Sequence, residues 1–148
     1  VLSALDRMGV DAGLADSEQP PLYEPACYLR KIDPAHDVVV DGRKISGNAQ
    51  YRQKEAIIQH GSITYARTPE RHLSTFADPG IGPEQFRDRV TSIRSTSGID
   101  REEAVETLEM TLAEWADSDV GTWTEDERAA AADRADEKYA TDAWNRRV

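Results

Sequence analysis

The chain has 148 residues, of which 39% are hydrophobic and 31% charged, and its formal net charge is −10. This length allows one domain with its own core. The acidic surplus argues against nucleic acid or an anionic membrane as a partner, because such a surface repels phosphate groups. The apolar runs are far shorter than the ~20 residues needed to span a bilayer, and no charged-then-apolar leader opens the chain, so we expect a cytoplasmic location.

The first half of the chain is predicted to form strands. A glycine and three prolines within residues 11–26 indicate an extended loop that leads into a strand near residues 27–32. Another strand is predicted over residues 57–65. Together with a hairpin between them, these elements make residues 23–66 the strand-rich part.

The hairpin is centred on Asp41-Gly42, which follows an apolar run. Both central residues of a type I′ turn need positive φ, and Asp-Gly satisfies this need. The turn therefore joins strands predicted at 37–41 and 43–47. Lys44 falls at the start of the returning strand.

Helices are predicted after residue 80. One opens at Pro83, a second near Asp100, and a third at Thr124, which is followed by a glutamate in capping-box spacing and runs to about Tyr139. Strands before helices predict an α+β fold, with residues 83–142 helical. The faces expected to be buried are Phe86, Val90 and Ile93 on the first helix, and Val105, Leu108, Leu112 and Trp115 on the second.

Small polar residues follow Lys44, and they are predicted to form a loop with open backbone N–H groups that an anion could approach: Ser46, Gly47, Asn48 and Ala49. A lysine beside such a loop supplies a mobile charge for phosphate. A P-loop is excluded, because its lysine must come directly after a glycine and before Ser or Thr. On the local pattern alone, an exposed lysine on a surface hairpin is the commoner arrangement.

The whole of residues 41–63, DGRKISGNAQYRQKEAIIQHGSI, resembles the lipoate-protein ligase A family of the biotin/lipoate ligase fold group. The likeness lies in the GRKISGNAQ segment at 42–50 and the QHGS segment at 59–62. It continues through residues 85–108 and 137–145, which look like the close of an archaeal-type catalytic domain. The resemblance implies a mixed or antiparallel sheet flanked by helices.

The resemblance also implies a two-step reaction. The carboxylate of lipoate attacks the α-phosphate of ATP to give lipoyl-AMP, and a lysine of an acceptor domain then attacks the acyl carbonyl. Lys44 matches the catalytic lysine of the family, and its positive charge would stabilise the negative charge that develops in both steps. ATP, Mg²⁺ and lipoate are the implied cofactors and substrate. No zinc site is expected from one cysteine and three irregularly spaced histidines.

Further residues are expected to contact ATP or lipoyl-AMP by the same resemblance. Asp37 matches a position near the adenosine, although His36 replaces the asparagine that precedes it in the family. The backbone of residues 46–49 would line the intermediate. His60 and Gly61 are further candidates, with a strand histidine and a bulge glycine as the equal alternative. The expected ligand-binding set is Asp37, Ser46, Gly47, Asn48, Ala49, His60 and Gly61.

The family's upstream signature of paired arginines, a glycine run and His-Asp does not occur in the chain. We therefore expect residues 1–148 to be a single, truncated catalytic domain, either a fragment or one subunit of a split enzyme. The implied partners are lipoyl domains of 2-oxoacid dehydrogenase complexes or the glycine cleavage H protein, together with an upstream half-domain or a separate accessory protein. The acidic composition with few lysines suggests a halophilic archaeon, with a mildly acidic mesophile as the alternative.

Cys27 supports an alternative activity. Octanoyltransferases of this fold group use a cysteine upstream of the same Lys-x-x-Gly segment as an acyl-thioester nucleophile, and Cys27-Tyr28 fits their pattern. The thiol would need a lowered pKa, which Lys44 or a histidine could provide. Against this, a lone cysteine on a strand is usually a small buried hydrophobe. The ATP-dependent ligase is the main prediction, the octanoyltransferase the alternative, and a non-catalytic subunit the third.

Overall fold

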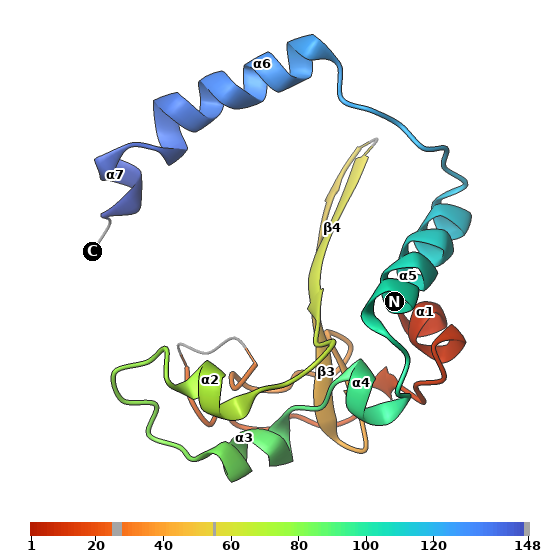
Figure 1. The fold of residues 1–148 in the computed structure, drawn as a ribbon, viewed down its shortest axis with the longest axis vertical. Helices are drawn as coiled ribbons and strands as arrows, with labels where there is room; N and C mark the ends of the chain where they lie inside the picture. Colours follow the sequence, from red (N-terminus) through yellow and green to blue (C-terminus); the bar gives the residue numbers. More distant parts are fainter. Residues whose placement is uncertain (25–27, 55, 147–148) are drawn as a thin grey trace. The chain divides into compact units, whose positions relative to one another are not determined.

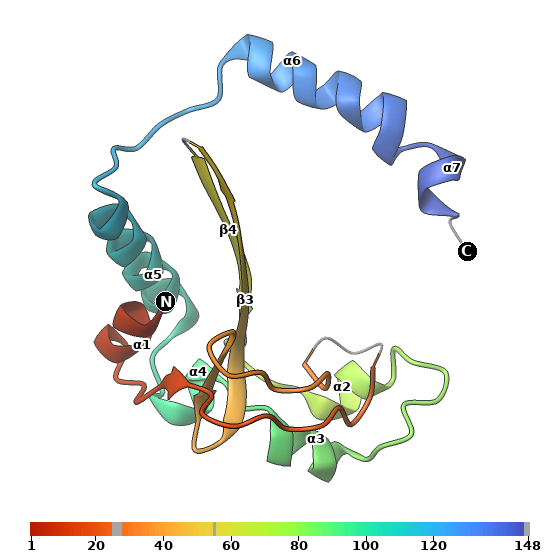
Figure 2. The same ribbon diagram turned by 180° about the vertical axis from the view of Figure 1, so that it is seen from behind.

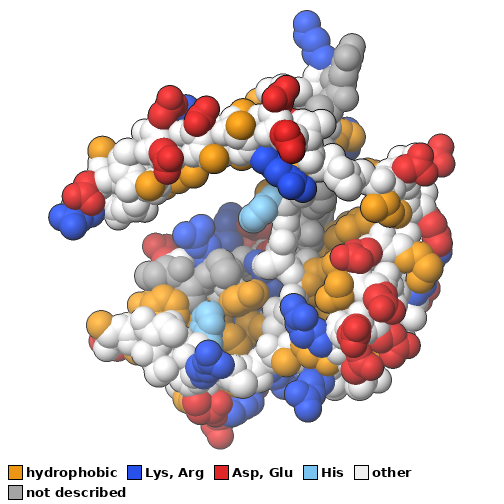
Figure 3. Space-filling model, turned by 45° about the horizontal axis from the view of Figure 1, so that its top comes forward, with side chains coloured by type: hydrophobic (Ala, Val, Ile, Leu, Met, Phe, Trp, Pro, Cys, Tyr) orange, Lys and Arg blue, Asp and Glu red, His pale blue; other side chains and the backbone are white. Residues whose placement is uncertain are grey.

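The structure is a computed structural model that describes residues 1–24, 28–54 and 56–146. It divides into two compact units, Val1–Ala116 and Asp117–Val148. Figure 3 shows acidic side chains spread over the surface of both units, as the net charge requires. Among the described residues, no helix is both long and apolar enough to cross a membrane. The prediction that residues 1–148 form a single domain stays a prediction.

The first unit contains a four-stranded antiparallel sheet in which strands adjacent in sequence are paired (Figure 1). Its strands are β1 (Gly13–Leu14), β2 (Asp37–Val40), β3 (Arg43–Gln53) and β4 (Ala56–Ile63). β3 and β4 continue as a long two-stranded ribbon beyond the end of β2. The predicted α+β fold is confirmed, with helices flanking the sheet.

The predicted hairpin turn is confirmed, because Asp41 has a φ of 50° and Gly42 a φ of 73°. The pairing of β2 with β3 then shifts between Val38 and Val39, so Ile45 is an extra residue on β3. This is a β-bulge, which inserts one residue into one strand of a pair.

One hydrophobic core lies between the sheet and three helices, α1 (Leu2–Arg7), α4 (Ile93–Thr96) and α5 (Arg101–Ala116). α1 and α5 lie side by side (Figures 1 and 2). The buried residues of this core are Ala4, Leu5, Met8, Val10, Val38, Val40, Ile45, Ile93 and Ala104.

The predicted buried face of α5 is wrong for three of its four residues, the exception being Leu108, which packs against the first core. Val105 and Leu112 are each 39% exposed and Trp115 is 71% exposed, whereas Ala104 and Thr111 are buried and Leu108 is partly buried. Ala104 packs in the core with Ala4 and Leu5 of α1, and the Thr111 hydroxyl accepts from the Arg7 guanidinium, so these smaller residues of α5 face α1. Val105 and Leu112 each follow one of these residues in sequence, so they point to a neighbouring side of the helix.

A second core lies around the helices α2 (Pro69–Leu73) and α3 (Pro83–Arg89). Its buried residues are Leu29, Leu73, Phe86 and Val90, with Tyr23, Tyr28, Phe76 and Ile81 packed against them. The helix predicted from Pro83 ends at Arg89, because Val90 is extended and forms a parallel bridge with Lys44. The three residues of the predicted face are therefore all buried, but Phe86 and Val90 lie in the second core and Ile93 in the first. α2 was not predicted.

The strand predicted near residues 27–32 is wrong for the residues that the structure describes. Residues 28–30 form a turn and bend, and Ile32 alone pairs, in an isolated bridge with Gln19. The Arg30 side chain donates to the backbone carbonyl of Glu24, which folds this segment back on itself. Cys27 lies outside the described residues.

The second unit consists of α6 (Glu125–Arg134), a π-helical turn η1 (Ala135–Tyr139) and α7 (Asp142–Asn145). The predicted capping box at Thr124 is confirmed: its hydroxyl accepts from the N–H of Glu127, whose carboxylate accepts from the N–H of Thr124. The Nζ of Lys138 lies 4.4 Å from the ring centre of Trp144. None of the described residues in these helices is buried.

Candidate active site

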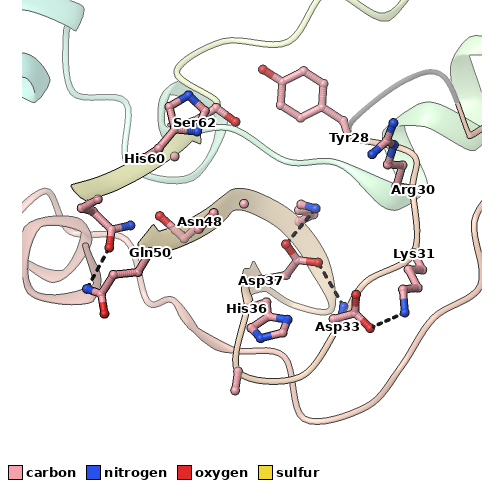
Figure 4. Close-up of a pocket in the computed structure, with 16 residues that line it drawn as sticks. Tyr28, Arg30, Lys31, Asp33, His36, Asp37, Asn48, Gln50, His60 and Ser62 are labelled. Atoms are coloured by element: carbon pink, nitrogen blue, oxygen red, sulfur yellow. Dashed lines mark hydrogen bonds and ion pairs between the residues drawn. The ribbon is translucent and has the colours of Figure 1, made fainter. Parts of the chain in front are cut away.

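An open pocket lies next to Asp37, the first residue of β2, where the β3–β4 ribbon continues without β2 beside it (Figure 4). One wall comes from β3 and β4 and the other from the segment 28–37. The lining residues are Tyr28, Arg30, Lys31, Asp33, Ala35, His36, Asp37, Lys44, Gly47, Asn48, Ala49, Gln50, Gln59, His60, Gly61 and Ser62. The pocket therefore brings together the predicted catalytic lysine and six of the seven predicted ligand-binding residues, the exception being Ser46.

Lys44 forms a buried ion pair with Asp37. Its Nζ lies 2.8 Å from Asp37 Oδ1, and the two side chains are 9% and 8% exposed. The other carboxylate oxygen, Oδ2, accepts the backbone N–H of Asp33 at 3.0 Å, as Figure 4 shows. The alternative of an exposed lysine on a surface hairpin is thus excluded. Each carboxylate oxygen of Asp37 has a partner within the protein. Its predicted contact with adenosine stays a prediction.

The backbone of Lys44 is fixed from two directions. It pairs with Val39 on β2, and its carbonyl accepts the N–H of Thr91 at 2.9 Å. Thr91 follows Val90, whose carbonyl accepts from the guanidinium of Arg67. Burial lowers the pKa of Arg67, and the nearby charges of Arg43 and Arg87 lower it further. Lys44 therefore projects from a rigid position between the sheet and the second core.

The predicted loop at Ser46, Gly47, Asn48 and Ala49 is wrong, because all four residues lie within β3. Ser46 and Gly47 pair with both β2 and β4, while Asn48 and Ala49 pair with β4. Small polar residues favour loops locally, but pairing along two neighbouring strands outweighs that preference. Beyond Gly47, β2 no longer covers this edge of β3, so backbone groups there remain available on the pocket side.

The strand register decides which side chains share the face of Lys44. Directly paired residues of an antiparallel sheet project to one face, and Asp37 pairs with Gly47, Gly47 with Ser62, and Ala49 with His60. Asp37, Lys44, Gly47, Ala49, His60 and Ser62 therefore share one face. Ser46, Asn48 and Gly61 project to the other, as do Gln50 and Gln59, which share a hydrogen bond in Figure 4.

The His60 side chain is exposed on the pocket face, and its ring makes no hydrogen bond to a described residue. The alternative of a bulge glycine is wrong, because Gly61 pairs with Asn48 in regular register. A Cβ on Gly61 would lie 2.6 Å from Asn48 Oδ1 and 3.0 Å from the carbonyl oxygen of Gly47. Glycine is thus required here by the close approach of the Asn48 side chain.

Several pocket residues were not predicted as site residues. Lys31 lies 3.1 Å from Asp33, and this hydrogen bond raises the pKa of the lysine. Arg30 and Tyr28 come from the same irregular segment. No spacing or motif in the sequence singles out Arg30 or Lys31, and Tyr28 stands out only as the aromatic residue that follows Cys27. The fold of segment 28–37 brings all three to the pocket.

Tyr28 connects the pocket to His72, a partly buried histidine. The ring of His72 lies 5.6 Å from the ring of Tyr28 and 5.0 Å from that of Phe86. His72 Nε2 is buried, with no hydrogen-bond partner among the described residues. Within residues 1–24, 28–54 and 56–146, no group of three or more His, Cys, Asp or Glu side chains is placed to hold a metal ion.

Curated relatives cover almost the whole chain. It is 32% identical to the octanoyltransferase LipM of Brevibacillus brevis, over 99% of this chain and 58% of the relative. It is 34% identical to the octanoyltransferase LipM of Kyrpidia tusciae, with the same coverage of both. The chain therefore spans somewhat more than half the length of these relatives.

Solved structures show the same fold. A lipoate-protein ligase A bound with ATP matches with a TM-score of 0.70 at 22% identity, over 97% of this chain and 54% of that chain. A bi-partite lipoate protein ligase from Thermoplasma acidophilum matches with a TM-score of 0.69 at 21% identity, over 97% and 53%. The family model of the lipoyl protein ligase A/B catalytic domain matches residues 1–113, which lie within the first unit. The chain belongs to this lipoyl protein ligase A/B catalytic domain family.

Proposed function

We propose that the chain acts in protein lipoylation as part of an octanoyltransferase. The enzyme would move an octanoyl group from a carrier-protein thioester to a lysine of a lipoyl domain. This was the alternative in the sequence analysis, and the similarity to octanoyltransferases LipM favours it over the ATP-dependent ligase. The observation that carries the proposal is the buried Lys44–Asp37 pair.

The pair matters because it limits the net charge of the pocket. Asp37 neutralises Lys44 at 2.8 Å, and Asp33 pairs with Lys31 at 3.1 Å. Of the basic lining side chains that the structure describes, Arg30 has no acidic partner in an ion pair. A triphosphate needs an excess of local positive charge, whereas the carbonyl of a thioester needs a hydrogen-bond donor. The described pocket suits the thioester better.

In the proposed reaction, the Cys27 thiolate attacks the octanoyl thioester, the carrier thiol leaves, and the acyl group becomes a thioester of Cys27. The amine of the acceptor lysine then attacks this carbonyl, forms an amide and releases the Cys27 thiol. An ammonium has three N–H donors, and Lys44 uses one on Asp37. Lys44 would donate another to the carbonyl oxygen as negative charge develops there.

The proposal is tested with octanoyl carrier protein and no ATP. Mass spectrometry should detect an octanoyl adduct on Cys27, and transfer to a lipoyl domain should follow. Cys27→Ser should stop transfer, and Lys44→Ala should slow it by on the order of 10²–10³, as for loss of one oxyanion donor. Full transfer by the Cys27→Ser variant would remove this mechanism.

ATP-dependent lipoate ligation is the second candidate, and the resemblance of residues 41–63 to lipoate-protein ligase A favours it. Lys44 would then stabilise lipoyl-AMP, with ATP bound by residues that include Asp37, Asn48 and His60, and Mg²⁺ brought in with the ATP. Pyrophosphate release from ATP and lipoate, lost in Lys44→Ala, would support this activity. Release by Cys27→Ser at the wild-type rate would favour it over octanoyl transfer.

The proposed partners follow from the reaction. A lipoyl domain of a 2-oxoacid dehydrogenase or the glycine cleavage H protein would accept the acyl group, and an upstream half-domain would supply the rest of the site. Assays should therefore include such a half-domain, and inactivity of every combination would support a non-catalytic subunit. A cytoplasmic location and an archaeal halophile origin stay predictions, and the two relatives compared above are bacterial.

A further inference from the structure

Two of the nine glycines are restricted in space, and both line the pocket. At Gly47, an added Cβ would lie 3.1 Å from Lys44 Cε, 3.3 Å from Lys44 Nζ and 3.4 Å from Asp37 Oδ1. At Gly61 the nearest atoms belong to Asn48 and to the Gly47 carbonyl. Neither glycine has a positive φ. Each position therefore needs glycine for space and not for backbone conformation.

The two restrictions lie on opposite faces of the same strand pair. Gly47 pairs with Asp37 on β2 and with Ser62 on β4, so its missing side chain opens the face of Lys44. Gly61 pairs with Asn48 on the other face. Lys44 and Gly47 share a face although they are three residues apart, because the bulge at Ile45 adds one residue between them.

The Lys44 side chain has little freedom to avoid a new atom at position 47. Its Nζ is held by Asp37 at 2.8 Å, and the Asp37 carboxylate is itself held by the Asp33 N–H at 3.0 Å. A methyl group on Gly47 would meet both partners of the ion pair at once. Lys44 would have to move away from Asp37 or the strands would have to separate.

We propose that Gly47 is a positioning residue for the catalytic lysine: it leaves the space in which Asp37 holds the Lys44 ammonium toward the acyl carbonyl. This role rests on the proposed acyl transfer, but it differs from the ligand contact through backbone N–H groups that the sequence suggested. Gly47 acts through Lys44 and does not need to touch the substrate.

The experiment compares Gly47→Ala with Gly61→Ala and Gly13→Ala. A Cβ at Gly13 has no described atom within 4 Å, so this variant controls for the substitution itself. Gly61→Ala introduces the closer contacts, 2.6 Å to the end of the Asn48 side chain and 3.0 Å to the fixed backbone carbonyl oxygen of Gly47, against 3.1 Å to a side-chain carbon for Gly47→Ala. These contacts lie on the face away from Lys44. A purely structural role would therefore make Gly61→Ala the more harmful variant in every assay.

We expect Gly61→Ala to lower the melting temperature more than Gly47→Ala, and Gly47→Ala to lower kcat for octanoyl transfer more. The loss in kcat should be at least about tenfold, with KM for the octanoyl carrier nearly unchanged, because Lys44 acts on charge that appears in the transition state. A kcat within twofold of wild type, or a loss that follows the order of the contact distances, would overturn the proposal.

Lysine side-chain NMR provides a readout that does not depend on activity. The chain has four lysines, so ¹³C-labelled lysine gives few Cε signals, and Lys44→Arg assigns the one of interest. Gly47→Ala should displace this signal and Gly13→Ala should not; an unchanged signal in Gly47→Ala refutes the positioning role. If Gly47→Ala fails to fold, Asp37→Asn should displace the same signal without adding an atom. If the wild-type protein transfers no octanoyl group, the proposed function is refuted. The NMR comparison would still decide whether Gly47 positions Lys44.

Discussion

Replacing Asp37 with alanine should destabilise the first unit by about 3–5 kcal/mol, the usual cost of breaking a buried ion pair by removing one partner. The Lys44 side chain is only 9% exposed, so its ammonium would remain buried without a counter-charge. The Asp33 N–H would also lose its acceptor. Such a loss is a large part of the 5–15 kcal/mol by which domains are typically stable.

A series of variants separates charge from shape. Asp37→Asn keeps an acceptor oxygen near Lys44 but turns an NH2 group toward the Asp33 N–H, which loses its acceptor. Because Lys44 keeps a hydrogen-bond partner, we expect a smaller loss of stability, of about 1.5–3 kcal/mol, the value of a hydrogen bond to a charged group. Asp37→Ala in a Lys44→Ala background removes both charges. In the Lys44→Ala protein, Asp37→Ala should lower the free energy of unfolding by about 1–3 kcal/mol less than it does in the wild type, because the two residues are coupled.

The assay is urea unfolding followed by far-ultraviolet circular dichroism. Tryptophan fluorescence is unsuitable for the first unit, because Trp115 is 71% exposed and Trp123 and Trp144 belong to the second unit. Glu114→Ala is the matched control, since it breaks the exposed Arg7–Glu114 pair and should change little. If Asp37→Ala costs the same with Lys44 present or absent, the pair does not stabilise the fold as argued.

Three further predictions concern other parts of the chain. Phe86→Ala should cost about 3–5 kcal/mol in urea unfolding, because its 3% exposed ring lies in the second core and its removal leaves a cavity; a loss below that of an exposed control such as Leu22→Ala would contradict the packing. Thr124→Ala should lower helix stability in the second unit by about 1 kcal/mol, through loss of the N-cap, and Thr124→Ser should restore it; equal helix content in all three proteins would argue against the cap. Hydrogen bonds and nearby positive charge lower the pKa of Glu114 and Glu70, and hydrogen bonds to Thr124 lower that of Glu127. The pKa values of these three carboxyl groups in the folded protein lie below the ordinary 4.5. Their contribution to stability is therefore present above pH 4.5 and is lost as the pH falls through the lowered pKa values. The melting temperature should fall over this acidic range, and the fall should be smaller in a Glu114→Gln, Glu127→Gln double variant.

The local parts of the fold could be predicted from the sequence. The turn at Asp41-Gly42 and the cap at Thr124 depend on a few adjacent residues whose backbone or side-chain chemistry is decisive. The continuation of β3 beyond the predicted strand 43–47, through Asn48 and Ala49, could not be predicted in this way. Its composition favours a loop, and only the distant partners on β4 make it a strand.

The buried face of α5 shows a different limit of sequence analysis. The spacing of Val105, Leu112 and Trp115 indicates an apolar stripe, and these residues do share one side of the helix. Periodicity does not say which neighbour packs against a helix. In the structure, α1 contacts the adjacent stripe that contains Ala104 and Thr111, through the first core and a hydrogen bond from Arg7 to Thr111.

The site was predicted residue by residue but not as an arrangement. Lys44 and Asp37 were both expected in it, on the strength of a family resemblance, and the structure places both in the pocket. Their pairing could not be predicted, because it depends on the bulge and on the register of β2 with β3. The proposed chemical role also rests on this pair, because a lysine neutralised by Asp37 suits a thioester carbonyl better than a polyphosphate.

The bulge at Ile45 links the core to the pocket. Without the extra residue, strict alternation would place Lys44 and Gly47 on opposite faces of β3. With it, Ile45 packs in the first core while Lys44 and Gly47 both face Asp37. A shift of one residue in the hairpin would move Lys44 toward the core and Ile45 toward the pocket, with a large cost at both positions. The Asp41-Gly42 turn, which fixes the register, therefore also determines the position of Lys44.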